Sequence, residues 1–396
     1  MSDTDNSAGR VEESGVSGPR PAPKLLAALT QPRIGGLDFL RAVSVLLVML
    51  DHSLDASSPA GWRIAAGGLS SLGVEIFFVL SGFLITLLLL DEYETHGRID
   101  YLAFYRRRVA RLMPVFYLFV LLALLLLWVR SREIPWAALI SAMLYVINYY
   151  QGLTGAETNI VAHCWSLAVE EQFYVIWPIA AGAILARRMT LANVLVAAIL
   201  VVWALRAALL WFDVVPISYL YRALETRADH LGVGCLVAVA VRSPAWRARF
   251  QALYRWRYSL PVLWLALYAS ARADAVSNVY KYCIGFVMEP VLIGLLIPLT
   301  IMASAGAGLP ARLVNSAALA HLGRISYGVY LFHGVIMYTV HRIVVTWTGS
   351  FTLGLIAASG AVIAFASVVF RWYEIPARRW INTRLMTRRS PQRQLT

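Results

Sequence analysis

The sequence predicts an all-α, polytopic membrane protein with about ten transmembrane helices around a polar cavity. Of its 396 residues, 59% are hydrophobic and only 14% are charged, whereas a soluble protein carries roughly 25% charged residues. Several apolar runs approach or exceed the length of about 18 residues that crosses a bilayer as a helix. Ionisable side chains occur inside these runs, and because they are costly in lipid, we expect them to face a polar interior.

Hydrophilic segments separate ten apolar runs that we expect to span the membrane. The runs cover residues 36–54, 70–91, 112–130, 168–186, 191–212, 226–241, 258–272, 282–303, 325–345 and 352–372. The segment 134–150 is apolar but interrupted and rich in aromatic residues, which favours an interfacial or re-entrant segment over a further span. We expect a transmembrane domain over residues 31–385, a disordered cytosolic tail over 1–30 and a basic cytosolic tail over 386–396.

The basic residues are distributed unevenly between the two sides of the predicted membrane domain. With a cytosolic N-terminus, 24 Arg and Lys residues fall in inner segments and seven fall in outer segments. This bias follows the positive-inside rule, so we expect a multi-pass protein of the plasma (inner) membrane with both termini in the cytosol. The net charge of +13 is explained by this membrane orientation, so we do not expect nucleic acid as a partner. Three dispersed cysteines indicate neither a disulfide framework nor a zinc site.

The first apolar run, 36–54, carries an arginine and a histidine on one helix face. Arg41 and His52 are eleven positions apart, which corresponds to about three turns and about 16 Å along a helix. Ionisable residues inside such an apolar helix indicate a functional site by default. The alternative is that the two side chains anchor the ends of the span at the membrane interfaces.

An arginine cluster precedes the third run. Arg107 and Arg108 each share a helix face with Arg111, and paired guanidinium groups suit phosphate oxygens. Positive-inside anchoring together with anionic lipid accounts equally well for this pattern. The sequence contains no Gly-rich phosphate loop of the Walker or dinucleotide type.

A group of polar and aromatic residues opens the fourth run. It suits recognition of a hydroxylated acceptor at a membrane mouth, and its members are His163, Trp165, Ser166, Glu170, Glu171 and Tyr174. Alternatively, the tryptophan and the tyrosine form part of an aromatic belt, and the two glutamates cap the start of a helix.

Further ionisable residues occur in other runs. We expect Glu75, near the outer end of the second run, to pair with Arg41 or His52, and Ser81-Gly82 in the same run to mark close helix packing. The later polar residues are each ordinary interior groups, but together they imply a polar cavity; they include Asp229, His230, Glu289, Tyr330 and His333. Metalloprotease and serine-hydrolase motifs are absent, so we expect neither chemistry.

With these motifs in order, the chain resembles the acyltransferase type 3 family of integral-membrane O-acyltransferases over about residues 33–385. The shared motifs are the Arg-ten residues-His pattern of Arg41 and His52, Gly73-Val74-Glu75 with Ser81-Gly82-Phe83, the Arg-x-x-Arg of Arg108 and Arg111, Trp165-Ser166-Leu167 with Glu170 to Tyr174, Ile325-Ser326-Tyr327 with Tyr330 and His333, and Glu374-Ile375-Pro376 with Trp380. Any one motif is weak, but six in order are specific. Departures are Glu75, where aspartate is common, and Ile375 and Ala377, where a basic or aromatic residue is common.

The resemblance implies an enzyme that moves an acyl group, commonly acetyl, from cytosolic acyl-CoA to a hydroxyl of a carbohydrate or small molecule. We expect no bound cofactor, with acyl-CoA as co-substrate, and, because metal-binding motifs are absent, no metal. A cell-surface polysaccharide, peptidoglycan, a glycolipid and a macrolide-like metabolite all remain open as acceptors. Some relatives carry a hydrolase-like domain after the spans, and we expect none here.

Each candidate residue then has an expected role. His52 is the general base, oriented by Asp38, Asp51 or Glu75. Arg107, Arg108 and Arg111 hold the CoA phosphates, while Arg41 guides the pantetheine arm or stabilises the oxyanion. The residues expected to contact the acceptor are His163, Trp165, Ser166, Glu170, Glu171, Tyr174, Tyr330 and His333. Direct transfer and an acyl-His52 relay both remain open.

Two other functions compete with acyl transfer. A transporter or flippase for an anionic or sugar-like solute would use the same charges as a translocation path. Transporters more often show two related halves with broken spans in matching positions, and neither is visible in this sequence. A scaffold without catalysis is the third possibility, and the arginine and histidine motifs disfavour it.

Overall fold

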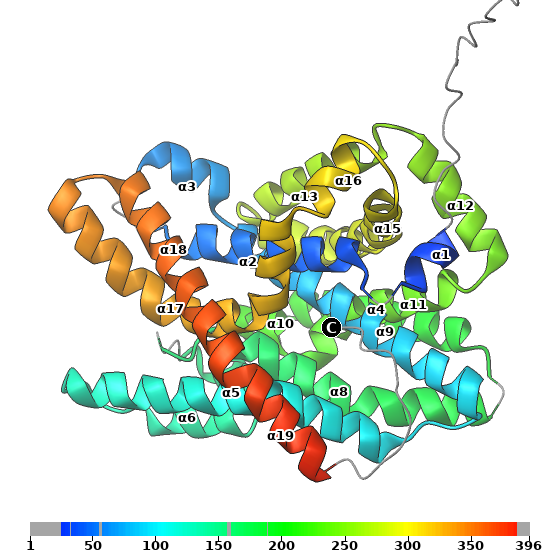
Figure 1. Ribbon diagram of the computed structural model, residues 1–396, viewed down its shortest axis with the longest axis horizontal. Coiled ribbons are helices and arrows are strands. Elements are labelled where there is room, and N and C mark those ends of the chain that lie inside the picture. The colour runs from blue at the N-terminus through cyan, green and yellow to red at the C-terminus, as the bar shows by residue number, and fades with distance from the viewer. Residues whose placement is uncertain (1–24, 32, 55–57, 157–159, 188, 386–396) are drawn as a thin grey trace, which may run out of the picture.

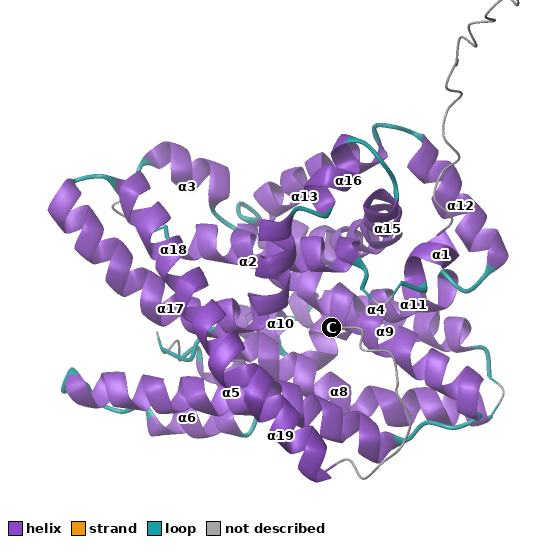
Figure 2. Cartoon of the chain, viewed as in Figure 1, coloured by secondary structure: helices purple, strands orange, loops and turns teal. Residues whose placement is uncertain are grey.

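The computed structural model describes residues 25–31, 33–54, 58–156, 160–187 and 189–385. Within these ranges every regular element is a helix, as Figures 1 and 2 show. The predicted all-α class is therefore confirmed. Residues 1–24 and 386–396, which make up most of the two predicted tails, lie outside the described residues.

Helices occur at all ten positions where spans are predicted. The α-helices are α1 (Leu25–Leu29), α2 (Gly35–His52), α3 (Ala60–Ala66), α4 (Leu69–His96), α5 (Tyr101–Val129), α6 (Trp136–Met143), α7 (Ile147–Thr154), α8 (Cys164–Ala186), α9 (Leu191–Trp211), α10 (Ile217–Arg222), α11 (Leu224–Ala240), α12 (Pro244–Arg255), α13 (Ser259–Asp274), α14 (Asn278–Tyr280), α15 (Phe286–Ala305), α16 (Leu309–Val314), α17 (Ala317–Thr348), α18 (Phe351–Val369) and α19 (Ile375–Leu385). Two π-helical turns interrupt this series, η1 (Lys281–Gly285) and η2 (Phe370–Glu374). The predicted spans fall on α2, α4, α5, α8, α9, α11, α13, α15, α17 and α18.

Six helical segments of the described chain are long and apolar enough to cross a membrane, so the predicted number of ten is not confirmed. They are Ala60–His96, Tyr101–Val129, Leu191–Trp211, Asn278–Ala305, Ala317–Thr348 and Phe351–Arg384. Other predicted spans fall on shorter or more polar helices. α11 and α13 have only 17 and 16 residues, and α2 carries Asp38, Arg41 and Asp51 within 18 residues.

Side-chain caps explain why two helices begin earlier than the apolar pattern predicts. α5 begins at Tyr101, because the Asp100 carboxylate accepts a hydrogen bond of 3.0 Å from the backbone N–H of Ala103. α17 begins after Ser316, whose hydroxyl oxygen accepts from the backbone N–H of Leu319 at 3.3 Å. The arginine cluster therefore lies on α5 itself, with its side chains fixed to defined helix faces.

Two short segments qualify the predicted organisation. The last residues of the predicted 1–30 tail form α1, and its buried leucines, Leu25 and Leu29, pack at 0 and 8% exposure, so that end of the tail is folded rather than disordered. The segment 134–150 contains α6 and the start of α7, and each of these helices has eight residues. Eight residues rise only about 12 Å, which agrees with a segment that does not span.

α2 lies at the centre of the fold, where it packs against α4, α15 and α17. The Ser44 hydroxyl donates a hydrogen bond to the Gly73 carbonyl of α4. At the far end of α2, the Asp51 carboxylate accepts from the backbone N–H groups of Gly68 and Ser70 at 3.1 and 3.0 Å, and so caps the start of α4. Figure 1 shows α17 beside α18, with α2 behind them. Residues on α2 therefore sit between three neighbouring helices.

Glycines allow α4 and α11 to cross at backbone contact. A Cβ atom on Gly82 of α4 would overlap the carbonyl oxygen of Leu231 on α11, and a Cβ on Gly234 of α11 would overlap that of Val79 on α4. Small residues at such crossings let two helices approach closely. The close helix packing predicted for Ser81-Gly82 is therefore confirmed at Gly82. This contact requires the Gly82 side of α4 to face α11.

We expect Gly82→Ala to lower the free energy of unfolding by about 1–3 kcal/mol, because the added methyl group forces two backbones apart. Gly360→Ala is the matched control, since nothing lies within 4 Å of a Cβ at that helical position. Thermal unfolding of both variants in one detergent measures the effect. Equal midpoints for the two variants would contradict the backbone contact.

Candidate functional site

A cavity of about 120 Å³ lies among α2, α4, α5, α8 and α17. This volume is room for a small group such as a short acyl chain. Its polar lining residues are Arg41, Ser81, Arg108, Arg111, Ser166, Glu170, Tyr174, Ser326, Tyr327 and Tyr330. These side chains come from five helices that are far apart in the sequence.

Three guanidinium groups converge on this cavity. Arg41 forms an ion pair of 3.5 Å with Asp38, which lies one turn nearer the start of α2. Arg108 stacks over the Tyr174 ring at 3.5 Å and lies 3.9 Å from the Glu171 carboxylate. Arg111 lines the same cavity. With Glu170 as the one lining carboxylate of the described chain, the lining carries three positive charges and one negative charge, so it suits an anionic ligand.

Arg107 is separated from the other two arginines of the predicted fork. Its guanidinium forms an ion pair of 3.5 Å with Glu92, near the end of α4, and it does not line the cavity. A helical step of 100° per residue places Arg107 on a different face from Arg108. The fork that faces the cavity is therefore Arg108 with Arg111.

Ser81 belongs to the cavity, although the sequence indicated only a packing role for it. Its hydroxyl donates a 2.6 Å hydrogen bond to the Glu170 carboxylate of α8. Ser81 faces the cavity while its neighbour Gly82 faces α11. The sequence alone does not show that Ser81 and Gly82 face different neighbours, because this depends on how α4 is rotated within the bundle.

Three histidines from separate elements gather next to the cavity. His52 Nδ1 and His333 Nε2 are 2.8 Å apart, and their rings stack with centroids 5.0 Å apart. His163, just before α8, lies 5.1 Å from the His333 ring, centroid to centroid. His333 is 1% exposed and His163 is 7% exposed, whereas His52 at the end of α2 is exposed.

The hydrogen bonds of this cluster fix the tautomers of two rings. His333 Nδ1 lies 2.6 Å from the Tyr330 carbonyl oxygen, which can only accept, so Nδ1 carries the proton. A neutral His333 then offers a lone pair at Nε2, and His52 Nδ1–H donates to it. His52 therefore keeps an unprotonated Nε2, the atom that a general base or a nucleophile requires.

Histidine, rather than a carboxylate, orients His52. Asp38 pairs with Arg33 at 2.7 Å and with Arg41. Asp51 instead caps α4, and Glu75 belongs to a separate polar cluster. None of the three carboxylates proposed as orienting partners bonds to His52 in the described chain. The sequence could not show the His52–His333 pair, because 281 positions separate the two residues.

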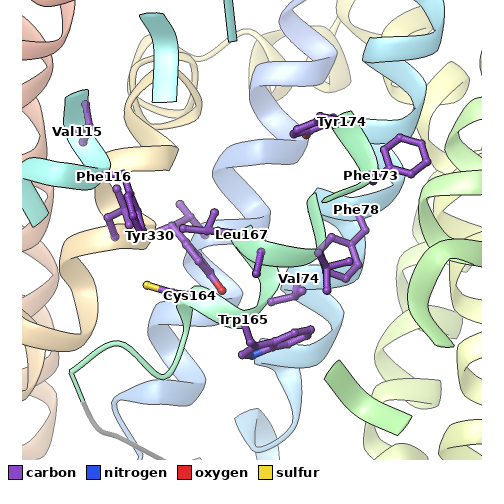
Figure 3. Close-up of a cluster of buried hydrophobic side chains, with 14 of the residues drawn as sticks. Val74, Phe78, Val115, Phe116, Cys164, Trp165, Leu167, Phe173, Tyr174 and Tyr330 are labelled. Atoms are coloured by element: carbon purple, nitrogen blue, oxygen red, sulfur yellow. The ribbon is translucent and has the colours of Figure 1, made fainter. Parts of the chain in front are cut away.

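Tyr330 joins the cavity to the histidine cluster. Its hydroxyl lines the cavity and lies 2.6 Å from the Ser166 hydroxyl, and it donates to the His163 carbonyl at 3.0 Å. Its own carbonyl accepts from His333. Figure 3 shows the ring reaching from α17 toward the first turn of α8, where Cys164 and Trp165 lie. One residue thus contacts both parts of the site.

The remaining candidates fall at different places. Trp165 is 7% exposed and packs on Tyr221 and on Phe78, which lines the cavity, but Trp165 itself is not a lining residue. Glu170, Glu171 and Tyr174 lie with Arg108 at the arginine end. Of the predicted acceptor-binding residues, His163, Ser166, Tyr330 and His333 lie at the histidine end.

Glu75 lies in a second buried cluster instead of pairing with Arg41 or His52. Its carboxylate is 3.5 Å from Arg227 and 3.9 Å from His230 Nε2, and all three side chains are fully buried. His230 is held by Asp229, which also pairs with Arg206 at 2.9 Å. The expected pairing of Glu75 with Arg41 or His52 is therefore wrong, because α11 brings Arg227 closer.

Comparison with known proteins agrees with this arrangement. A family model described as an acyltransferase domain matches residues 34–371. The chain belongs to this acyltransferase family. The match includes every residue that lines the cavity and all three histidines.

Curated relatives of the acyltransferase are named as O-acetyltransferases. This chain is 30% identical to the "Putative peptidoglycan O-acetyltransferase YrhL" of Bacillus subtilis, over 76% of this chain and 48% of the relative. It is 28% identical to the "Peptidoglycan O-acetyltransferase OatA" of Listeria monocytogenes over 87% of this chain and 56% of the relative. The chain thus spans about half the length of these relatives. No solved structure matches the chain.

Proposed function

We propose that this chain is a membrane-bound O-acyltransferase that moves an acyl group, acetyl in the simplest case, from cytosolic acyl-CoA to a hydroxyl of a carbohydrate. The observation that carries the proposal is the connection, through Tyr330, between an arginine-lined cavity and a histidine with a free Nε2. Family membership and the names of the relatives support acyl transfer to a polysaccharide.

The arginine end is the donor side in this proposal. Arg108 and Arg111 are separated by three positions on α5 and both face the cavity, so they bind the CoA phosphates at its mouth. In this proposal the nucleotide stays at the mouth and the thioester end enters the cavity of about 120 Å³. The positive-inside bias of the sequence supports a cytosolic position for this end, with both termini on the same side of the plasma membrane.

Arg41 guides the donor arm and does not act at the carbonyl beside His52. About 16 Å of helix separate Arg41 from His52, and the Arg41 side chain extends toward Asp38, away from His52. Of the two roles that the sequence left open for Arg41, the geometry supports guiding the pantetheine arm.

His52 then performs the proton transfers. Its Nε2 accepts the proton of the acceptor hydroxyl while the hydroxyl oxygen forms a bond to the thioester carbonyl carbon. The tetrahedral oxyanion collapses, the C–S bond breaks, and the imidazolium returns the proton to the departing sulfur. His333 holds the reactive tautomer and stabilises the imidazolium through its Nε2 lone pair.

A relay is the second route that this geometry supports. His52 Nε2 attacks the thioester carbonyl carbon, the C–S bond breaks, and CoA leaves as the thiolate. The acceptor hydroxyl then attacks the acyl-His52 carbonyl, the C–N bond breaks, and the hydroxyl proton passes to the released imidazole. Because His52 is exposed at the end of α2, an acceptor reaches it without entering the cavity. A mass gain of one acyl group on His52 after mixing with acyl-CoA alone identifies the relay, whereas direct transfer leaves the protein mass unchanged.

We expect His52→Ala to lower the rate of acyl transfer by at least about 10²-fold, because removing a general base costs 10²–10⁴-fold. Transfer of labelled acetyl from acetyl-CoA to cell-wall glycan by membranes containing the variant measures this effect. His96→Ala, at an exposed histidine that ends α4, is the control and retains activity. Near wild-type transfer by His52→Ala would exclude His52 as base and as relay.

We expect Arg108→Ala with Arg111→Ala to raise the KM for acetyl-CoA about 10-fold or more, because charge-assisted hydrogen bonds contribute roughly 1.5–3 kcal/mol each. Arg98→Ala, an exposed arginine between α4 and α5, controls for the loss of a basic residue near the same end. Initial rates at varied acetyl-CoA concentration give KM. An unchanged KM in the double variant, or solute counterflow without CoA, favours a transporter over the enzyme.

A further inference from the structure

A second buried polar cluster lies outside the proposed catalytic site. It contains three carboxylates, Glu75 of α4, Asp274 at the end of α13 and Glu289 of α15, which are 0, 6 and 1% exposed. One oxygen from each lies within 4.8 Å of the other two. Octahedral and larger oxygen shells around Ca²⁺ or Mg²⁺ place ligand oxygens within about twice the metal–oxygen distance of 2.0–2.6 Å.

Only one of the six oxygens of these carboxylates has a hydrogen-bond donor in the described chain: Glu75 Oε1 accepts from the Ser71 hydroxyl at 3.1 Å and from Arg227 at 3.5 Å. Among the described residues, no hydrogen-bond partner lies at either oxygen of Asp274, at either oxygen of Glu289 or at Oε2 of Glu75. Buried carboxylates without donors are costly, because ionised groups need a partner once water is removed. Two cations act on the cluster: Arg227, whose Nη2 lies 3.5 Å from Glu75 Oε1 while its Nε and Nη1 have no hydrogen-bond partner in the described chain, and Lys281 of η1, which faces Glu75 and Asp274. Two cations do not balance three carboxylates.

His230 gives an independent indication of a bound cation. Its Nδ1 lies 2.8 Å from the Asp229 carboxylate, so Nδ1–H donates and Nε2 of the neutral ring carries a lone pair. That Nε2 is fully buried, has no hydrogen-bond partner and lies 3.9 Å from Glu75 Oε2. With the ring neutral, two acceptors therefore face each other, and a cation between them would satisfy both. A carboxylate that orients a histidine in this way is the usual second partner of a metal-bound imidazole.

The backbone brings the ligands together at a local irregularity. The π-helical turn η1, Lys281–Gly285, directly precedes α15, and π-turns inside helices occur frequently at functional sites. A Cβ atom on Gly285 would overlap the Asp274 carboxylate. Asp274 therefore reaches the cluster only because residue 285 has no side chain.

We propose that Glu75, Asp274 and Glu289 bind one divalent cation, with His230 as a neighbouring nitrogen donor on the Glu75 side. Carboxylate oxygens select hard cations such as Mg²⁺, Ca²⁺ and Mn²⁺. The ion links α4, α13 and α15, which otherwise present like charges to one another. The Phe78 ring separates this site from the cavity. It lines the cavity, and it also contacts His230 and Arg227 of the second cluster.

No metal-binding motif is visible in the sequence, because the three ligands come from separate helices over more than 200 positions. The expectation that the protein uses no metal rested on such motifs. The proposed ion is structural and takes no part in the acyl transfer described above.

The test uses the full-length protein purified in detergent without chelator. We expect elemental analysis to find about one equivalent of a divalent metal per chain. We expect stripping with EDTA to lower the thermal midpoint by roughly 3 °C or more, and Mg²⁺, Ca²⁺ or Mn²⁺ to restore it. NaCl at matched ionic strength is the control for screening and restores nothing.

Two isosteric variants, Asp274→Asn and Glu289→Gln, are expected to lose the bound metal and the response to divalent cations. Glu94→Gln is the matched control, because Glu94 pairs with Arg242 on the exposed end of α4. If either cluster variant fails to fold, the wild-type stripping experiment still decides. A wild-type protein without stoichiometric metal, whose midpoint no divalent cation changes, would overturn the proposal and show that the carboxylates are neutralised by protons.

Discussion

The proposed site depends on the hydrogen bond between His52 and His333. Because the Tyr330 carbonyl holds the proton of His333 at Nδ1, the lone pair at His333 Nε2 orients His52 and leaves its Nε2 free. The bond also ties the end of α2 to the middle of α17, two helices that pack along each other. A carboxylate in this position would add a negative charge to the bundle interior, whereas a neutral imidazole supplies the same acceptor without that cost.

The cost of burying charge also explains the division of the bundle into two polar regions. One region holds Arg41, Arg108 and Arg111 around the cavity, and the other holds Glu75 with Arg227 and its neighbours. In both regions, charged groups on different helices face each other across an otherwise apolar interior. Phe78 lies between the regions, so acyl chemistry and the proposed cation site are separated by a hydrophobic ring.

Much of the architecture could be predicted from the sequence because helices in an apolar chain follow hydropathy. All ten predicted spans fall on helices, and Arg41, Arg108 and Arg111 meet at one cavity as their motifs suggest. The number of membrane-crossing helices could not be predicted as reliably. Helices such as α2 and α11 are shielded by neighbours in the bundle and can therefore be short or charged.

Partners across the bundle could not be predicted, because they depend on the rotation of each helix. Arg107 is next to Arg108 in sequence but faces Glu92. Ser81 is next to Gly82, yet one residue faces the cavity and the other faces α11. Asp51 adjoins His52, but its carboxylate caps α4 instead of orienting the imidazole.

In the proposed enzyme the arginine-lined cavity leads an acyl thioester to His52. A structure determined with a non-transferable acetyl-CoA analogue tests this path most directly. We expect phosphate density at Arg108 and Arg111, density for the pantetheine arm along the cavity past Arg41, and the thioester carbonyl next to Tyr330 and His52. Analogue density that leaves the cavity empty, or that places the carbonyl away from the histidines, would contradict this path.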